Sequence, residues 1–578
     1  MKLKWNKQIL LGVLGTMFLV IGCQKKEGKQ TLPVAQKSIA RVDSMPFMPQ
    51  PFKIMDFKKT ARLYDSIVYD STQTGEYWPL IWKDGSRKNF DQETYGIYTA
   101  IGDTRQGPEN HKGMFHESLN TISSVLGASL MGIDKSNQHG EDYVGMLKNY
   151  FNSDTGWNIM MNNTGPDVAL LGGGYGRDWW YDVYPNLLFY GVANFYPEHE
   201  DFEYIQRSIA DRFQKADSVL AGNYHHTFFD YAAMEPKDNW ICHQEDAAAG
   251  HAYVLYAAYQ KFGDEKYLTS AKSSLEALLS QEENRFYEIL MPFGAYVAAR
   301  MNAEEGTSYD YQNLLDWTFN GDSVCREGWG VLVDNWNGYD VSGLVGSTVD
   351  HGGFAFLMNT YDTMWPLVPL VRYDARYANT IGKWMLNAAN ASKFFYPYEM
   401  ADEHQTLPHK KEVTKGVIAY EGLIKNPHLE GYAHLKAPIA IGDGPHWTPD
   451  NPDVSQFSVY GSGHVGFAGA IIDTTDVPGI LKLDCLATDF YRGDAYPTYL
   501  FYNPYEASRA VQYTCQGTEK VDLYDALSHQ VIARDVTSES TIEIPAKQSR
   551  LIVEIPSGSS VEKREGTYYV EDVVVAYQ

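Results

Sequence analysis

The sequence predicts a mainly α fold in which helical hairpins form a closed toroid, followed by a small C-terminal antiparallel β-sandwich. Between about residues 110 and 475, loops rich in glycine, aromatic and acidic residues each lead into an apolar helix without a clear polar face. A second helix with a single apolar stripe usually follows. Fully apolar inner helices that alternate with striped outer helices are typical of a ring of helix pairs. Beyond residue 497, short β-rich runs separated by turn residues replace this pattern.

The first residues have the features of a targeting segment. Three lysines precede an apolar run over residues 9–21, which is too short to span a bilayer. The four residues that end at Cys23 resemble a bacterial lipobox. We therefore expect residues 1–22 to be a signal peptide and Cys23 to carry a lipid anchor, with an ordinary cleaved signal peptide as the alternative. Residues 23–50 are expected to be a flexible tether, and the protein an outer-membrane lipoprotein facing the cell surface or the periplasm.

Composition limits the possible partners. The formal net charge of −25 disfavours binding to nucleic acid or to anionic lipid through bulk charge. The chain contains 13 Trp, 42 Tyr and 25 Phe, which is far too aromatic for a disordered protein. Beyond Cys23, the four cysteines lack the paired spacing of a zinc site, so they are either buried thiols or a disulfide pair. No metal and no cofactor is expected.

The order of helix types places the elements of the N-terminal half. Residues 51–109 are expected to pack irregularly on the toroid, with one short outer helix over residues 56–69. Three inner helices follow from the apolar pattern, and they are expected over residues 116–133, 179–196 and 246–262. The striped outer helices are expected over residues 141–151, 202–220 and 267–280.

The C-terminal half continues the pattern with more interruptions. The remaining ring elements are a helix pair over residues 290–302 and 310–319, an inner helix over 354–365, an outer helix over 377–391, and closing segments over 418–424 and 465–472. Pro366 and Pro369 are expected to end the inner helix before them. Residues 321–346 form a long Gly- and Trp-rich excursion of the kind that is usually functional. The predicted toroid thus spans residues 110–497 and the sandwich residues 498–578.

The first candidate site follows a glycine-rich loop at residues 172–176. This loop delivers Asp178 to the start of a buried helix, where it is a candidate catalytic carboxylate. The glycines do not fit the pattern that binds dinucleotides. A helix cap is the alternative role, because Asp is favoured at helix N-termini. The candidate substrate-binding residues around it are Tyr175, Arg177, Trp179 and Trp180.

The second candidate site is the run that begins at Trp240. Glu245 and Asp246 open a helix whose next residues are small, which leaves room above the helix end. Because adjacent residues point in different directions on a helix, one carboxylate is expected to face the cavity and the other to cap. Trp240 and His243 are expected to contact substrate, although a core position is the alternative for the histidine.

The third candidate site is Asp350-His351 with two glycines after it. The glycines let backbone or ligand approach closely, so Asp350 is a candidate acid, base or hydroxyl ligand and His351 a binding residue. The preceding loop carries Trp329 and Trp336, which are also expected to bind substrate. The later candidates for ligand contact are Tyr396, Glu399, Glu421, Asp443, His446 and Trp447.

Carboxylates and aromatic rings around one cavity suit sugar chemistry. Glycoside hydrolysis generally uses two carboxylates, of which one protonates the leaving oxygen and the other activates water or attacks the sugar carbon. Trp and Tyr faces stack on the C–H face of a pyranose, and ten of the 13 Trp lie between residues 157 and 447. We therefore expect a glycoside hydrolase whose carboxylates are Asp178, Glu245 or Asp246, and Asp350.

An Asp- and Trp-rich toroid with a lipoprotein-type signal and a terminal β-sandwich resembles the six-hairpin (α/α)6 glycosidase superfamily. Its members are common in the glycan-degrading systems of Bacteroidota-type bacteria. The resemblance covers roughly residues 110–555 and implies cleavage at the N-terminal end of the inner helices, often by inversion. The superfamily also contains polysaccharide lyases, which need a Tyr or His base and a uronic acid substrate. A glycan-binding lipoprotein without activity would also fit these residues, as would an isomerase or epimerase with a histidine pair.

Overall fold

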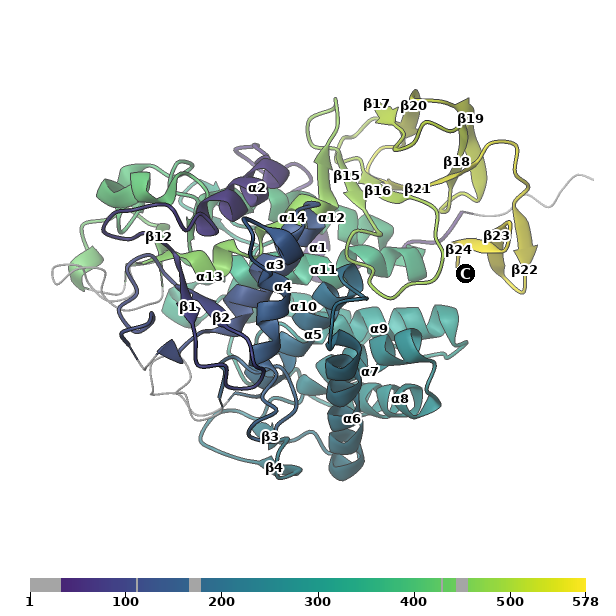
Figure 1. Cartoon of the computed structure of the whole chain (residues 1–578). Coiled ribbons are helices and arrows are strands. Elements are labelled where there is room, and N and C mark those ends of the chain that lie inside the picture. Colours follow the sequence, from purple (N-terminus) through teal and green to yellow (C-terminus); the bar gives the residue numbers. More distant parts are fainter. Residues whose placement is uncertain (1–32, 111–112, 166–177, 428–429, 443–455, 578) are drawn as a thin grey trace, which may run out of the picture.

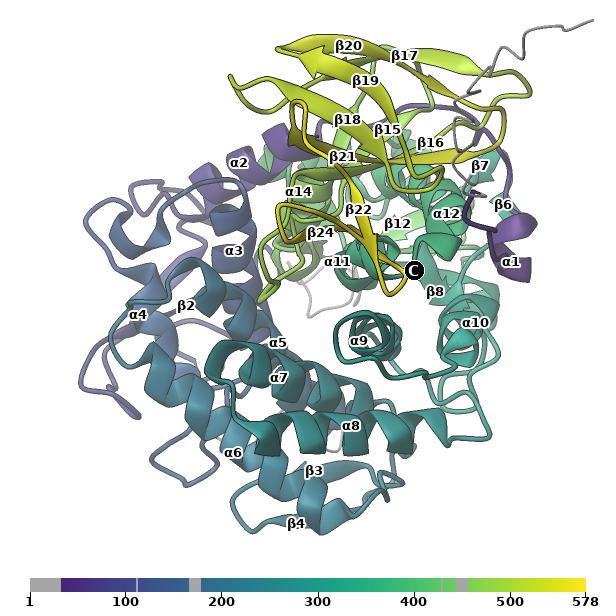
Figure 2. The ribbon, with the colours of Figure 1, turned by 90° about the vertical axis from the view of Figure 1, so that its right-hand side faces the viewer.

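The computed structural model describes residues 33–110, 113–165, 178–427, 430–442 and 456–577 (Figure 1). Among these residues, six buried helices form the inner ring: α3 (Ser118–Leu130), α5 (Trp179–Phe195), α7 (Ala247–Phe262), α9 (Met291–Glu304), α11 (Leu357–Tyr373) and α14 (Val465–Ile471). Each of them packs against the next in the chain, and α14 packs against α3. The inner helices therefore close into a ring (Figure 2).

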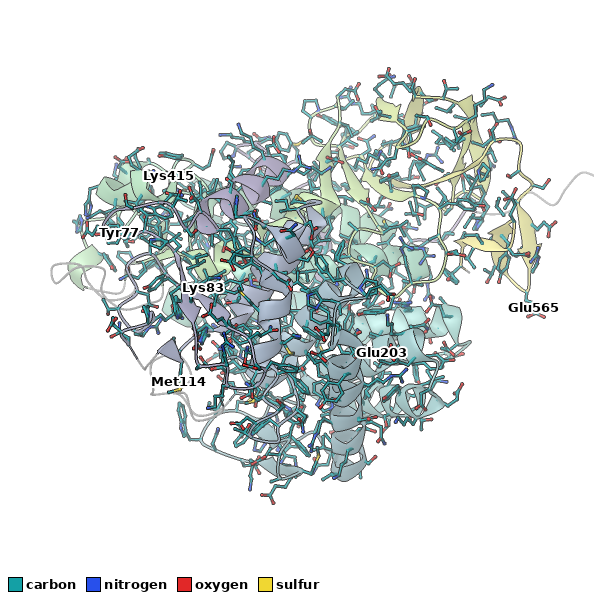
Figure 3. The ribbon with its side chains drawn as sticks, in the orientation of Figure 1. Tyr77, Lys83, Met114, Glu203, Lys415 and Glu565 are labelled. Carbon is teal, nitrogen blue, oxygen red and sulfur yellow. A yellow bond between two sulfur atoms is a disulfide. The ribbon has the colours of Figure 1, made fainter. Side chains whose placement is uncertain are left out.

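Striped helices surround this ring. They are α2 (Phe57–Val68), α6 (Phe202–Leu220), α8 (Glu265–Leu279) and α10 (Gln312–Asn320). The short α4 (Tyr143–Met146) and α12 (Ala378–Ala391) also lie outside the ring, but α12 is buried on nearly all sides. α6 buries Phe202, Ile209 and Phe213 against the ring, while Glu203 on the same helix points outward (Figure 3). The 3.6-residue period of these apolar positions is what holds each outer helix with one face on the core.

Two prolines lie inside α11 and do not end it, contrary to the sequence-based expectation. Pro366 and Pro369 each remove a backbone N–H, which disfavours a helix interior. Every residue of α11 is nevertheless buried, and the indole Nε1 of Trp365 donates to the carbonyl of Thr488 at 3.1 Å. Packing on all sides therefore outweighs the local preference, as tertiary context commonly does.

Residues 418–424 were expected to help close the helical ring. In the structure they form strands instead. β10 (Ala419–Tyr420) pairs with β13 (Phe457–Ser458). β11 (Gly422–Ile424) joins an antiparallel sheet whose order is β12 (Ile439–Ile441), β11, β9 (Phe354–Phe356), β8 (Val345–Ser347) and β5 (Trp329–Val331). Two strands of this sheet, β5 and β8, come from the Gly- and Trp-rich excursion at residues 321–346. Strand β9 leads directly into α11.

The C-terminal residues form three further antiparallel sheets, of which the last contains β22 (Glu562–Arg564), β23 (Thr567–Val570) and β24 (Val573–Ala576). Of the other two, the larger has the order β14 (Ile472–Thr474), β15 (Leu481–Asp484), β16 (Thr498–Tyr502), β21 (Ser549–Pro556), β18 (Val521–Asp525) and β19 (Gln530–Val536). The smaller pairs β17 (Arg509–Thr514) with β20 (Glu539–Ile544). Buried residues of both sheets, including Phe501, Val511 and Ile542, share one apolar cluster, and β16 and β21 also pack on α12. Among the described residues, none of the helices has the length and apolarity needed to cross a bilayer.

Candidate active site in the ring cavity

A cavity of about 450 Å³ lies where the inner helices begin. Four carboxylates line it, and each stands in a loop or strand just before a helix or next to one: Glu117, Asp178, Glu288 and Glu421. The other polar and aromatic lining residues include Arg105, Trp180, Tyr181, Tyr287, Arg326, Asn359 and Tyr460. The ring brings these residues together because α3, α5, α9 and α11 all begin at the cavity. The cavity therefore collects side chains that are far apart in the sequence.

Asp178 points into the cavity and does not cap its helix. It occupies the residue before α5, but its side chain makes no capping hydrogen bond to the described residues. One carboxylate oxygen accepts from Nε2 of Gln244 at 2.8 Å. Oε1 of Gln244 accepts from the N–H of Trp180 at 3.0 Å. Gln244 thus uses both ends of its amide, one for the helix start and one for Asp178.

The pKa of Asp178 lies far above that of an ordinary carboxyl group. Burial raises it to about 7, and the nearby charge of Glu288 adds to the rise. The hydrogen bond from Gln244 and the charge of Arg326 oppose this rise. A carboxyl group with this pKa is present in both protonation states near neutral pH, which is what a general acid needs.

Glu288 has a different environment in the same cavity. Its Oε1 pairs with Nη1 of Arg326, and its Oε2 accepts from Nδ2 of Asn359 at 3.0 Å. Burial raises the pKa of Glu288, whereas Arg326 and Asn359 oppose that rise. Its backbone carbonyl accepts from Nε1 of Trp329 at 3.2 Å. Glu288 is therefore fixed from three sides, and the arginine favours its charged form.

Arg326 is itself held by an aromatic face. Its guanidinium group lies 3.7 Å from the centre of the Trp329 ring, and such contacts favour a cation. On the outer side, Asp350 approaches Arg326 with 3.8 Å between Oδ2 and Nε. Trp329 is completely buried, so it supports Arg326 and has no face available for a ligand.

Glu117 and Glu421 approach the cavity from α3 and from the small sheet. Glu117 has a φ of 55°, a left-handed backbone that is strained for a residue with a Cβ and often occurs at functional sites. The carbonyl of Glu421 accepts from the N–H of Leu357 at 2.9 Å, which ties the sheet to the start of α11. Burial is the main reason why the pKa of Tyr460 is raised, and the charges of these two carboxylates are the next largest reasons. They form a second acidic group around that tyrosine.

Three tyrosines complete the wall between the two acidic groups. Burial raises the pKa of Tyr181, Tyr287 and Tyr460 far above the ordinary value, and the surrounding carboxylates add to the effect. Their hydroxyl groups are therefore neutral hydrogen-bond donors. The ring of Tyr181 also lies against Trp180, with 3.9 Å between the ring centres. Together these side chains offer apolar faces and polar edges to a ligand.

The other three predicted catalytic residues lie outside the lining of this cavity as its described residues define it. Asp246 is fully buried, and its Oδ2 accepts from the N–H of Tyr287 at 3.1 Å. Glu245 pairs with Arg285 at 3.1 Å and with His225. Asp350 stands beside Arg326 with a half-exposed side chain. Asp246 and Glu245 thus contact residues next to the cavity, namely Tyr287 and Arg285, and are not themselves among its described lining residues.

The predicted binding residues are scattered in a similar way. Trp180 lines the cavity, whereas Trp179 and Trp336 are buried and donate to Tyr231 and Asp334, respectively. Trp240 is 71% exposed, and His243 lies 3.5 Å from Asp238, also outside the described lining. The following predicted residues lie outside the described part of the chain: Cys23, Tyr175, Arg177, Asp443, His446 and Trp447, together with the side chain of His351.

Sequence reasoning missed Glu117 and Glu288. A usable signal was present for both, because each lies in or directly after one of the recurring entry loops of the ring. Glu421 was among the later candidates for ligand contact, and the structure places it in the cavity lining. No short motif marks any of them, because the cavity is assembled from separate loops.

Cys242 and Cys325 form a disulfide across 83 residues, which settles a choice that the sequence left open. Cys325 lines the cavity, and Cys242 lies two residues before Gln244. Disulfides persist mainly in oxidising compartments outside the cytoplasm. Among the described residues, no group of three or more His, Cys, Asp or Glu side chains is arranged to hold a metal ion.

Comparison with known proteins gives only distant structural likeness. No family model and no curated protein matches the sequence. The chain is similar to a β-L-arabinofuranosidase from Geobacillus stearothermophilus, with 10% identity, a TM-score of 0.33, and 90% and 85% of the two chains covered. It is also similar to an unsaturated glucuronyl hydrolase from Streptococcus agalactiae, with 11% identity and a TM-score of 0.34, over 76% of this chain and 97% of the other. A third similar structure is a glucoamylase from Hormoconis resinae, with 10% identity and a TM-score of 0.32, over 90% of this chain and 95% of the other. Likeness at this level leaves the function to be inferred from the cavity itself.

Proposed function

We propose that the protein is a glycoside hydrolase and that the ring cavity is its active site. The observation that carries the proposal is the pair Asp178 and Glu288, two carboxylates of one cavity with different partners. Burial raises the pKa of both, to about 7 for Asp178, whereas Arg326 pairs with Glu288 and opposes the rise there. A pair of titratable groups whose environments differ in this way divides into an acid and a base.

In the proposed reaction, Asp178 donates its proton to the glycosidic oxygen as the bond to the sugar carbon breaks. The Glu288 carboxylate then acts at the sugar carbon, either by taking a proton from an attacking water or by attacking directly. In the second case, water cleaves the glycosyl ester on Glu288, and the Asp178 carboxylate takes the proton of that water. In the first case, water adds OH to the sugar and its other proton ends on Glu288. Glu288 then loses that proton to solvent and Asp178 regains one, which restores the starting states. Arg326 stabilises the negative charge that Glu288 carries before the reaction.

The remaining lining residues suit a sugar ring. Trp180 and Tyr181 offer adjoining aromatic faces for the C–H side of a pyranose. Tyr287 and Tyr460 have raised pKa values, so they stay protonated and can donate to sugar hydroxyl groups. A carbohydrate in oligomeric or polymeric form is the proposed substrate.

The same tyrosines speak against a lyase. Lyase chemistry needs a base that removes the proton next to a uronate carboxyl group, and a tyrosine serves best when its pKa is lowered. Here burial and nearby carboxylates raise the pKa of Tyr181 and Tyr460. In addition, Arg326 is already paired with Glu288 and Arg105 with Asp103 at 2.8 Å. The cavity therefore favours hydrolysis.

We also propose that the protein is exported and anchored through Cys23. The lipobox-like sequence at Cys23 is the first support, and the disulfide between Cys242 and Cys325 is an independent one. Labelling with a radioactive fatty acid tests this: incorporation in the wild type and its loss in Cys23→Ser are expected. If Cys23→Ser still incorporated the fatty acid, the proposed anchor on Cys23 would be wrong.

The hydrolase is tested by product release from a panel of plant, microbial and host glycans. We expect new reducing ends without the ultraviolet absorbance of an unsaturated uronate. Asp178→Asn and Glu288→Gln should each abolish release, whereas Asp350→Asn should retain it. An absorbing product would assign a lyase, and glycan binding without any product would assign a capture protein.

A further inference from the structure

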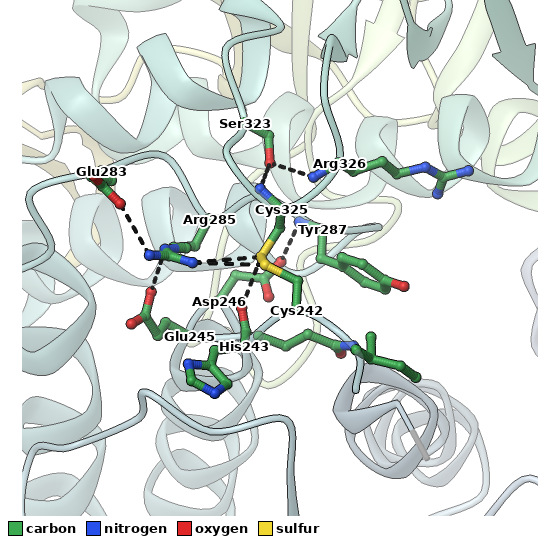
Figure 4. The surroundings of a disulfide bond; sticks show 12 residues. Cys242, His243, Glu245, Asp246, Glu283, Arg285, Tyr287, Ser323, Cys325 and Arg326 are labelled. Carbon is green, nitrogen blue, oxygen red and sulfur yellow. Dashed lines mark hydrogen bonds and ion pairs between the residues drawn. A yellow bond between two sulfur atoms is a disulfide. The ribbon is translucent and has the colours of Figure 1, made fainter. Parts of the chain in front are cut away.

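Residues 242–246, here named the clamp segment, contact three of the loops that supply cavity side chains. Figure 4 shows two of these contacts, those with Tyr287 and with Cys325. The first contact is with the start of α5. Gln244 donates to Asp178 at 2.8 Å and accepts from the N–H of Trp180 at 3.0 Å. Gln244 is itself completely buried, so its amide is committed to these two partners. The clamp segment therefore sets the direction of the Asp178 carboxylate.

The second contact is with the loop before α9. Asp246 accepts from the N–H of Tyr287 at 3.1 Å, and Tyr287 directly precedes Glu288. Within the same region, the carbonyl of Glu245 accepts from Nε2 of Gln281 at 3.2 Å. The backbone that carries Glu288 is thus held to the clamp segment by its neighbour.

The third contact is the disulfide between Cys242 and Cys325. Cys325 directly precedes Arg326, and the N–H groups of both residues donate to Oγ of Ser323 at 3.2 Å. Arg285 packs beside the bond, with Nη1 at 3.7 and 3.9 Å from the two sulfur atoms. It also pairs with Glu245 of the clamp segment. The turn that presents Arg326 is therefore joined covalently to the segment that holds Asp178.

We propose that the Cys242–Cys325 disulfide is a positioning crosslink for the active site, which keeps Arg326 on Glu288 in register with Gln244 on Asp178. This inference rests on the proposed hydrolase. Reduction by a dithiol breaks the S–S bond, gives each sulfur one electron and one proton, and converts the reductant to its own disulfide. The turn that carries Arg326 is then held only by non-covalent contacts, and its guanidinium group leaves the place that Glu288 requires.

The crosslink has a signature that a purely stabilising role lacks. The charge of Arg326 lowers the pKa of both Glu288 and Asp178, and the bond from Gln244 lowers that of Asp178. If these contacts loosen, both pKa values rise. Loss of activity at low pH follows protonation of Glu288, and loss at high pH follows deprotonation of Asp178. Both limbs of the pH profile of kcat/KM should therefore move to higher pH.

The test compares the wild type, the wild type treated with dithiothreitol, and Cys242→Ser/Cys325→Ser, all below their unfolding temperatures. We expect kcat to fall on the order of 10–100-fold, because small misplacements of reacting groups have effects of this size. KM should change by less than about twofold, since the ring and its sugar-binding faces remain. Cys515→Ser is the matched control, because Cys515 is a free cysteine directly after β17, and it should leave every value unchanged.

Two results would contradict the proposed positioning role of the disulfide. One is a double variant whose kcat and pH limbs equal those of the wild type, which leaves the hydrolase intact. The other does not depend on activity: hydrogen exchange of the backbone over residues 284–290 and 321–329 should become faster on reduction. Unchanged exchange there contradicts the proposal even if no glycan is cleaved, an outcome that would by itself remove only the proposed hydrolase. Reduced wild type serves for this measurement if the double variant does not fold.

Discussion

Gln244 donates to the Asp178 carboxylate at 2.8 Å while its own carbonyl oxygen accepts from the backbone of Trp180 at 3.0 Å. The residue that directs the candidate acid thus comes from the loop of the next inner helix. Gln244→Glu keeps an oxygen for Trp180 but removes the donor for Asp178 and adds a negative charge beside it. We expect the pKa of Asp178 to rise and the alkaline limit of activity to move to higher pH, as a pH profile of kcat/KM would record. An unmoved limit would mean that Gln244 does not control this carboxyl group.

The substitution Asp178→Asn removes the proposed proton donor with little change of shape. General acid catalysis typically contributes about 10²- to 10⁴-fold, so kcat should fall within that range for a substrate with a poor leaving group. A sugar linked to a very acidic phenol needs no protonation, and its cleavage should fall much less. Asp91→Asn is the control, since the Asp91 side chain is 95% exposed and lies outside the described cavity lining, and its kcat should stay within about threefold of the wild type. Equal losses in both variants would contradict the assignment.

The raised pKa of Asp178 makes activity sensitive to pH near neutrality. The acid must be protonated to act, and burial raises its pKa to about 7. We therefore expect kcat/KM to fall about tenfold per pH unit above that value. Measurement across pH 5–9 at constant ionic strength would check this. A rate that stays level to pH 9 would exclude Asp178 as the acid.

Asp246 makes folding stability depend on pH in the opposite sense to an ordinary salt-bridged carboxylate. Burial raises its pKa to about 7 in the folded protein, against about 3.9 in an unfolded chain. Between these values the folded state binds more protons, so the free energy of unfolding falls as pH rises from about 4 to about 7. Asp246→Asn cannot ionise and should show a smaller fall, by a few kcal/mol. Denaturant unfolding of both proteins at pH 5 and pH 8 would measure the difference, and parallel falls would contradict it.

Tyr460→Phe separates hydrolase from lyase chemistry. In the hydrolase, the Tyr460 hydroxyl only donates a hydrogen bond, and such a bond is worth about 0.5–1.5 kcal/mol. We therefore expect kcat/KM to fall by no more than about tenfold. In a lyase that used Tyr460 as its base, the same change would abolish the reaction. The matched substitution Tyr181→Phe should behave like Tyr460→Phe.

The ring could be predicted from the sequence because its signal is local and repeated. Apolar periodicity distinguishes α5, buried on all sides, from α6 with its single stripe, and both helices lie close to their expected bounds. Two elements did not follow local rules. α11 continues through its prolines because packing stabilises it, and residues 418–424 extend as strands because β9 and β12 provide pairing partners.

The candidate site was less accessible to prediction for a physical reason. Asp178 was found because a glycine loop and two tryptophans mark it locally. Glu288 and Glu421 acquire their environment only from distant residues, Arg326 in one case and the start of α11 in the other. The run that contains Glu245 and Asp246 was expected to supply a catalytic carboxylate, but neither residue lines the described cavity. In the structure these two side chains contact Arg285 and the backbone of Tyr287, positions that no linear pattern reveals.

Closure of the ring also determines when the protein can fold. The contact of α14 with α3 joins nearly the last helical element to the first inner one. A nascent chain that ends before Val465 leaves the apolar flanks of α3 and α11 without their partner. Long-range contacts of this kind form late and expose aggregation-prone surface until they do. The chain must therefore be almost fully synthesised, and kept from associating with other copies, before its cavity exists at all.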